Sequence, residues 1–144
     1  MPRLVWAVLC RRAVIDKYTN LASVHDVVDS LFAAQEPEMG SQIIIDLNVI
    51  TNWARSDFAL PEDPFYCRCV AVHPNGSRGR GAALEVNLSL SSRVRNVFRF
   101  PGIDFSGFGE YEFVVERAPT KDSPDRDWHV AFRIPLQVAP QSDD

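Results

Sequence analysis

The end of the chain alternates between apolar and polar residues over more than ten positions. From residue 128 onward one parity is apolar, and its members are Trp128, Val130, Phe132, Ile134, Leu136 and Val138. A period of two places these side chains on one face of a strand, whereas a helix would spread them around its surface. Burying six such side chains would contribute roughly 9 to 18 kcal/mol by transfer from water, as an upper bound. The pattern predicts a half-buried strand that anchors a core.

The same alternation recurs earlier in the chain. In the long segment 43–53 the apolar parity includes Ile43 and Trp53, and Asp46, Asn48 and Asn52 are expected to point outward. Residues 4–10 are apolar on both parities, which predicts a strand covered on both faces. Turn-forming clusters such as Asn75-Gly76 separate the segments. Further strands are predicted at 65–73, 84–90, 94–100 and 111–116.

Residues 21–31 allow two interpretations. Leu21, Val24, Val28 and Leu31 are spaced as one face of a helix, and Thr19 or Asn20 is available as a cap. The segment is also rich in β-branched residues and follows a predicted strand after one short polar turn, as in a hairpin. Because the neighbouring segments are strands, we favour the strand and keep the helix as the alternative.

About eight strands with regularly spaced turns predict an all-β fold, a two-sheet antiparallel β-sandwich or a barrel. With 144 residues the chain fits one domain, expected over residues 1–139, with a flexible tail at 140–144.

The net charge and the amino-acid composition limit the partners and the cellular location that we expect for this protein. The net charge of −4 gives no overall attraction to nucleic acid, and no stretch reaches the ~18 apolar residues that a membrane span needs. Three cysteines are an odd number, which argues against a disulfide framework and for a reducing compartment. We therefore expect a cytoplasmic protein with no nucleic-acid partner and no membrane span.

A row of arginines is the most informative candidate for a contact surface. Arg93, Arg95 and Arg99 share one parity of a predicted strand, and Arg78 and Arg80 lie in the turn region before it. Guanidinium groups on one sheet face suit phosphates or an acidic partner, including a second copy of this acidic chain. The alternative is a solvated outer face whose arginines keep an edge strand from mispairing.

Metal binding, calcium binding and thiol catalysis have weaker support in the sequence. Cys67, Cys69 and His73 share one parity and could offer two thiolates and an imidazole to a metal, but no second cluster completes a four-ligand shell. Asp63, Asp125 and Asp127 lie in loops and could meet around calcium, although solvated loop charge is the commoner explanation for such residues. A catalytic thiol would pair one of these cysteines, or Cys10, with a histidine base, whereas strand cysteines are usually buried and inert. No catalytic residue, resident metal or cofactor is predicted.

The chain resembles a family of small uncharacterised bacterial proteins grouped as a domain of unknown function. The resemblance rests on short segments: a first strand ending in Cys10, then Val14 to Val24, a strand closing on Trp53, Gly109 to Phe113, Trp128, and Ile134 to Val138. It implies an immunoglobulin-like or C2-like sandwich and brings no catalytic residues with it.

The predicted function is therefore a non-enzymatic interaction or accessory module. It would bind a protein partner or self-associate through the row Arg93, Arg95 and Arg99 or through an unpaired strand edge. Two alternatives stay open, a calcium- or ligand-dependent module at the acidic loops and a metal or thiol site at Cys67, Cys69 and His73.

Overall fold

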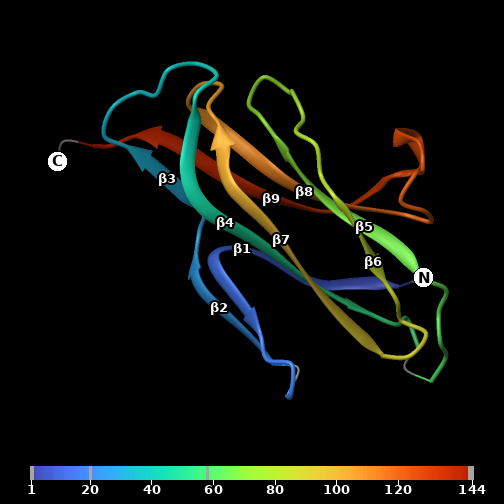
Figure 1. The fold of residues 1–144 in the computed structure, drawn as a ribbon. Helices are drawn as coiled ribbons and strands as arrows, with labels where there is room; N and C mark the ends of the chain where they lie inside the picture. Colours follow the sequence, from blue (N-terminus) through green and yellow to red (C-terminus); the bar gives the residue numbers. More distant parts are fainter. Residues whose placement is uncertain (1, 20, 58, 143–144) are drawn as a thin grey trace.

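The computed structural model describes residues 2–19, 21–57 and 59–142, and these form two β-sheets packed face to face (Figure 1). One sheet has four strands in the order β2-β1-β4-β7, and the other has five in the order β3-β9-β8-β5-β6. The strands are β1 (Arg3–Ile15), β2 (Ala22–Val27), β3 (Ser30–Ala33), β4 (Gln42–Ala54), β5 (Phe65–Val72), β6 (Ala83–Val86), β7 (Arg93–Asp104), β8 (Gly109–Ala118) and β9 (His129–Pro140). The predicted all-β sandwich is confirmed.

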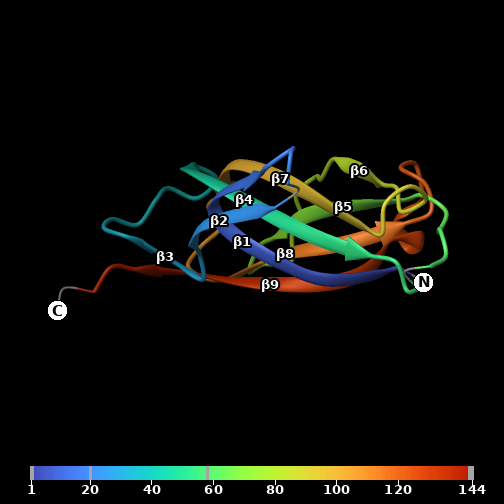
Figure 2. The same cartoon turned by 90° about the horizontal axis from the view of Figure 1, so that it is seen from below.

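The core fills the space between the two sheets. Period-two rows from both inner faces meet there, with Trp53 from β4 packed edge-on against Phe65 of β5 at 5.0 Å between ring centroids. Figure 2 shows the two layers, with β1 lying beside β9 along one side of the molecule. On the opposite side each sheet ends in an edge strand, β7 in one layer and β6 in the other.

Residues 21–31 form strands, which makes the helix alternative wrong. They are two strands in different sheets, so the described chain has nine strands where about eight were expected. Strand β2 is antiparallel to β1, whereas β3 runs parallel to β9. Asp26 has φ 55°, a left-handed conformation that bends the chain near the point where it passes from one sheet to the other.

The predicted burial of all six apolar residues at 128–138 is wrong for two of them. Ile134, Leu136 and Val138 lie in the core, whereas Val130 and Phe132 are 45% and 47% exposed. The register of β9 with β8 shifts between Val130 and Phe132, and β3 pairs with β9 only from residue 137 onward. Trp128 precedes the strand and is buried outside the main core, where its indole N–H donates to the Ser123 carbonyl at 3.0 Å.

Asn48 and Asn52 are on the outer face of β4, as expected, but they are buried rather than solvated. Apolar residues of the β1–β2 hairpin cover this face, where Ala13, Ile15 and Val24 belong to a small second cluster around Ile50. Asn48 uses its Nδ2 to donate to the Arg11 carbonyl at 2.9 Å. The alternation predicts that this face of the sheet is exposed to solvent, but the first hairpin of the chain partly covers it.

Strand β9 extends to Pro140, the first residue of the expected tail, and the Gln141 N–H donates to the Ala33 carbonyl at 2.9 Å. The last two tail residues, 143–144, lie outside the described residues. Within the part of the chain that the structure describes, no helix is long and apolar enough to cross a bilayer.

Candidate functional site

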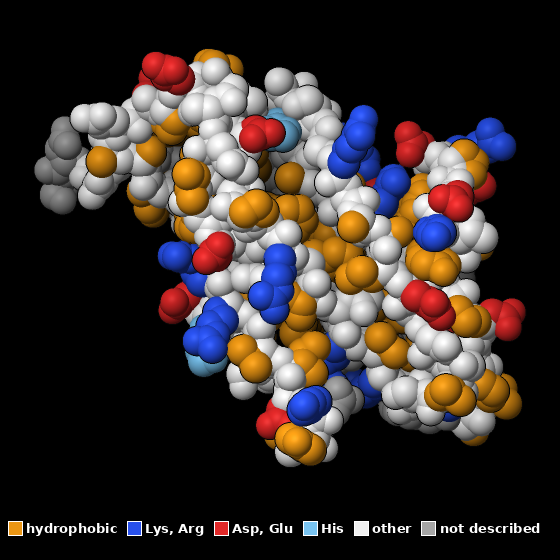
Figure 3. All heavy atoms as spheres, viewed as in Figure 1, with side chains coloured by type: hydrophobic (Ala, Val, Ile, Leu, Met, Phe, Trp, Pro, Cys, Tyr) orange, Lys and Arg blue, Asp and Glu red, His pale blue; other side chains and the backbone are white. Residues whose placement is uncertain are grey.

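The predicted arginine row lies on the outer face of edge strand β7. Arg93, Arg95 and Arg99 pair with Ala54, Asn52 and Asn48 of β4 and so share that strand's outer face. Arg99 is exposed and the other two are half-buried. Figure 3 views the molecule from the side of β4 and β7 and shows basic side chains standing among apolar ones on this face.

The surface beside this row is apolar. Ile50 is buried there, and Trp6, Val8 and Val97 are half-buried against it. Strand β7 pairs only with β4 among the described strands, so its other edge carries no neighbouring strand over twelve residues. The row therefore borders both an apolar face and an open set of backbone hydrogen-bonding groups.

The arginines expected nearest to this row lie elsewhere. Arg78 and Arg80 follow β5 in the five-stranded sheet, and Arg78 forms an ion pair with Glu116 of β8. Because neighbouring residues of β5 and β8 such as Cys69 and Val115 face the core, Glu116 lies on the outer face of that sheet. The five arginines thus form two groups on opposite sides of the sandwich.

The second group surrounds a buried carboxylate. Glu116 is 4% exposed, and its Oε1 accepts from Arg68 Nε at 3.1 Å and from Arg78 Nη2 at 2.6 Å. The guanidinium of Arg68 stacks on the Trp128 ring at 4.2 Å and lies 3.6 Å from Asp125. A pocket of about 470 Å³ opens beside this cluster.

Sequence reasoning missed this cluster although one signal was present. Arg68 and Glu116 face each other across β5 and β8 and are 48 residues apart in the chain. Arg68 on β5 and Glu116 on β8 have opposite charges, and both point to the outer face of the sheet. Such residues typically form a cross-strand pair once the two strands are known to be neighbours. Their adjacency was the information that the sequence did not provide.

Cys67 and Cys69 are buried in the core on β5. Burial raises the pKa of Cys67 to about 11, although an Asn96 amide 3.8 Å from its sulfur acts in the opposite direction. Burial also raises the pKa of Cys69 strongly. Thiols held in the neutral form are poor nucleophiles and poor metal ligands at neutral pH.

His73 is separate from these thiols. Its ring packs edge-on against Tyr111 at 5.5 Å between centroids, and its Nδ1 is 3.1 Å from the Ser77 carbonyl oxygen. It therefore stabilises the turn that follows β5, and the structure does not bring it together with Cys67 and Cys69 into a metal site: among the described residues, no three His, Cys, Asp or Glu side chains are grouped as a metal would require.

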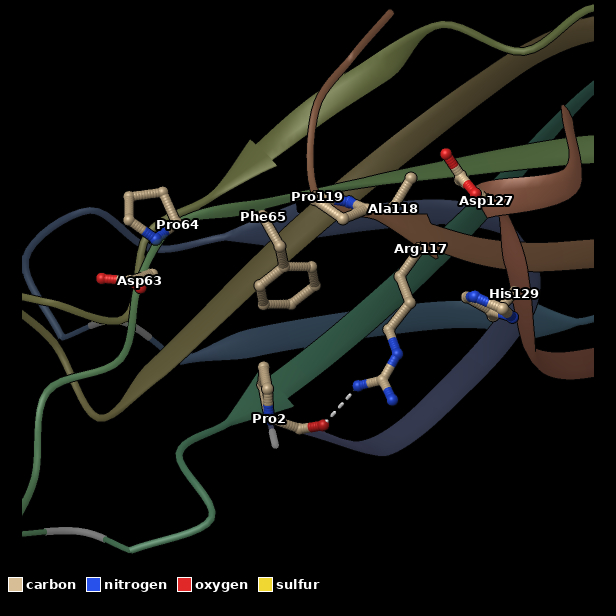
Figure 4. A pocket seen from close by; sticks show the side chains of 9 residues that line it. All are labelled: Pro2, Asp63, Pro64, Phe65, Arg117, Ala118, Pro119, Asp127 and His129. Carbon is tan, nitrogen blue, oxygen red and sulfur yellow. Dashed lines mark hydrogen bonds between the residues drawn. The ribbon is translucent and has the colours of Figure 1, made fainter. Parts of the chain in front are cut away.

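The acidic loop residues are divided between two places. Asp63 and Asp127 line a cavity of about 680 Å³ at one end of the sandwich, whereas Asp125 faces Arg68. Figure 4 shows Asp63 and Asp127 at opposite sides of the cavity with Phe65 and Arg117 between them. Arg117 donates to the Pro2 carbonyl at 2.6 Å, which ties β8 to the start of β1.

The end cavity has a mixed lining. Phe65, Ala118 and three prolines give it apolar walls, and His129 and Arg117 add two nitrogen-bearing side chains. Among the described residues that line it, no nucleophilic side chain is paired with a base. No family model, curated protein or solved structure matches this chain.

Proposed function

We propose that this protein is a non-enzymatic interaction module whose β7 edge receives an acidic, extended segment of another protein. The observation that carries the proposal is the juxtaposition of an open twelve-residue strand edge with three arginines on one face of the same strand. Main-chain hydrogen bonds to the edge would supply affinity, and alternate acidic side chains would select the segment. The immunoglobulin-like or C2-like type and the cytoplasmic location remain predictions.

Charge favours a different protein over a second copy as the partner. Two β7 strands paired antiparallel around a twofold axis would keep their outer faces on the same side. The two arginine rows would then lie next to each other, and like charges on neighbouring strands are destabilising. A glutamate- or aspartate-bearing strand would instead place opposite charges across from Arg93, Arg95 and Arg99.

A defined peptide tests the proposal. An eight-residue peptide with alternating glutamate and valine should bind in fluorescence anisotropy, more weakly at high salt, and should slow hydrogen exchange in β7. The matching peptide with lysine in place of glutamate should not bind. Equal binding of both peptides, or protection that excludes β7, would contradict the proposal.

Variants in which the arginines of β7 are replaced with glutamate test whether their charge is needed for peptide binding. The triple variant Arg93→Glu, Arg95→Glu, Arg99→Glu changes the net charge from −4 to −10, since each reversal contributes −2, and should lose binding. A control triple reverses the charge of the exposed Lys121, Arg126 and Arg133, which lie on β9 of the other sheet or in the loop before it; it makes the same charge change away from β7 and should keep most of the binding. Arg99→Glu alone, at an exposed position, covers the case in which the triple variant does not fold.

A further inference from the structure

The pocket on the outer face of the five-stranded sheet is lined by three arginines. Arg68 comes from β5, and Arg78 and Arg80 come from the segment that leads into β6. This segment lies close against β5, because the Gly79 N–H donates to the Ala71 carbonyl at 2.8 Å and a Cβ at Gly81 would be 2.5 Å from the Cys69 carbonyl oxygen. Glycine at 81 therefore allows the approach that brings Arg80 to the same hollow as Arg68.

Two of the three guanidinium groups are held in place. Glu116 accepts from Arg68 Nε and Arg78 Nη2 through one oxygen, and the Trp128 ring lies against the face of the Arg68 guanidinium. Hydrogen bonding at Nε and stacking on an aromatic ring fix the plane of a guanidinium and leave its outer Nη edge for another acceptor. Arg68 is thus preorganised for an oxyanion in the pocket.

The third arginine has no such anchor. Arg80 is exposed and makes no hydrogen bond or ion pair with any described side chain. Asp125 lies 3.6 Å from Arg68 Nη2, too long for a hydrogen bond, and its side chain is 98% exposed. This aspartate can therefore leave the pocket at little cost.

The charges around the pocket do not cancel. Three arginines contribute +3 and Glu116 contributes −1, so the pocket carries +2 once Asp125 has turned away. A phosphate monoester carries close to −2 at neutral pH and offers three acceptor oxygens. The volume of about 470 Å³ lies within the range of small-molecule pockets and exceeds what a phosphate group alone would fill.

We propose that this pocket binds a phosphorylated small molecule, with its phosphate between Arg68, Arg78 and Arg80 and with Asp125 displaced. The inference does not depend on the proposed role of β7, because the pocket is on the other sheet and faces the opposite way. A purely structural ion-pair cluster would account for Glu116 and its two arginines. It would not account for a third arginine at the same hollow.

The test is an NMR titration at constant ionic strength and pH 8 with inorganic phosphate, glucose 6-phosphate and glucose as probes. Saturable shifts confined to residues 68, 78–81 and 125 are expected for both phosphates, tighter for the sugar phosphate, and none for glucose. Binding of inorganic phosphate with no gain for the sugar phosphate would show an anion site without a small-molecule partner and would overturn the proposal. So would binding of a single-stranded oligonucleotide with no binding of either small phosphate.

Three variants test the role of each charge. Arg80→Gln, at an exposed position, should weaken phosphate binding about tenfold, the loss expected for one charge-assisted hydrogen bond. Asp125→Asn should strengthen binding severalfold because it removes the competing carboxylate. The control Arg133→Gln removes an exposed arginine of the same sheet that pairs with Glu112 and should leave binding unchanged. Equal losses in Arg80→Gln and Arg133→Gln, or no binding even by Asp125→Asn, would overturn the proposal.

Discussion

The buried carboxylate of Glu116 allows a test of whether burial or distance decides the strength of an ion pair. Its oxygen is closer to Arg78 than to Arg68, at 2.6 Å against 3.1 Å. The Arg78 side chain is 46% exposed, however, whereas that of Arg68 is 17% exposed. Exposed pairs are screened by water and typically contribute about 0 to 1 kcal/mol, and pairs withdrawn from water can contribute more.

The expected magnitudes follow from these exposures. Replacing Glu116 with alanine should reduce the free energy of unfolding by about 3 to 5 kcal/mol, because it leaves the Arg68 guanidinium buried without its carboxylate. A domain of this length has roughly 7 to 20 kcal/mol in total, so the variant should still fold. In double-mutant cycles with glutamine, the Glu116–Arg68 coupling should reach about 1.5 to 3 kcal/mol and the Glu116–Arg78 coupling should stay below about 1 kcal/mol.

Urea unfolding followed by circular dichroism measures these couplings, with the m-value as a check that the unfolded state is unchanged. Raising the salt concentration to about 1 M should reduce the Arg78 coupling and leave most of the Arg68 coupling. A coupling to Arg78 that equals or exceeds the coupling to Arg68 would refute the reasoning, because distance rather than burial would then control the pair.

Three further predictions concern stability. The raised pKa of Cys67 means that its contribution to stability is fully present below about pH 9 and is lost as the pH rises toward 11, by about 1.4 kcal/mol at pH 10. In urea unfolding, Cys67→Ala should reduce the loss at pH 10 by this amount and leave the part that comes from the other buried thiols, such as Cys69. Tyr111→Phe removes a buried hydroxyl that accepts from Ser106 N at 2.9 Å and donates to the Gly107 carbonyl at 2.7 Å, and it should lower stability by about 1 to 2 kcal/mol and speed hydrogen exchange in that loop. Gly81→Ala should destabilise the protein by about 1 to 3 kcal/mol, whereas Gly79→Ala, whose new Cβ would be 3.6 Å from its nearest neighbour, should change the melting temperature little; equal shifts for the two would contradict the close approach at residue 81.

Local alternation was sufficient to predict most of the strands. The parity rule places Trp53 and Phe113 in the core and Arg93, Arg95 and Arg99 on an outer face, because each assignment needs only the neighbouring residues of the same strand. The same rule was wrong for Val130 and Phe132. The register of β9 with β8 shifts there, and β3 is too short to pair with this part of β9, so both side chains are partly exposed. Bulges and strand lengths depend on the partner strand, which is distant in the sequence.

The arginine pocket shows the same limit at the level of the site. From the sequence, Arg78 and Arg80 were placed only in the turn region before the arginine row, whereas the fold groups them with Arg68 and Glu116 on the other sheet. That grouping depends on which strand is next to β5, and the sequence contains no local signal for strand order. The burial of Asn48 has a similar origin, since the β1–β2 hairpin that covers it bends back over its own sheet.

The positions of the chain ends determine how the molecule would respond to tension. The N-terminal end of β1 and the C-terminal end of β9 lie at opposite ends of the sandwich (Figure 1). A pull on both ends would act along these strands, so that β1 would slide against β4 while β9 would slide against both β3 and β8. Hydrogen bonds loaded in shear must break together rather than one after another, so the fold should resist stretching far better than its equilibrium stability alone suggests.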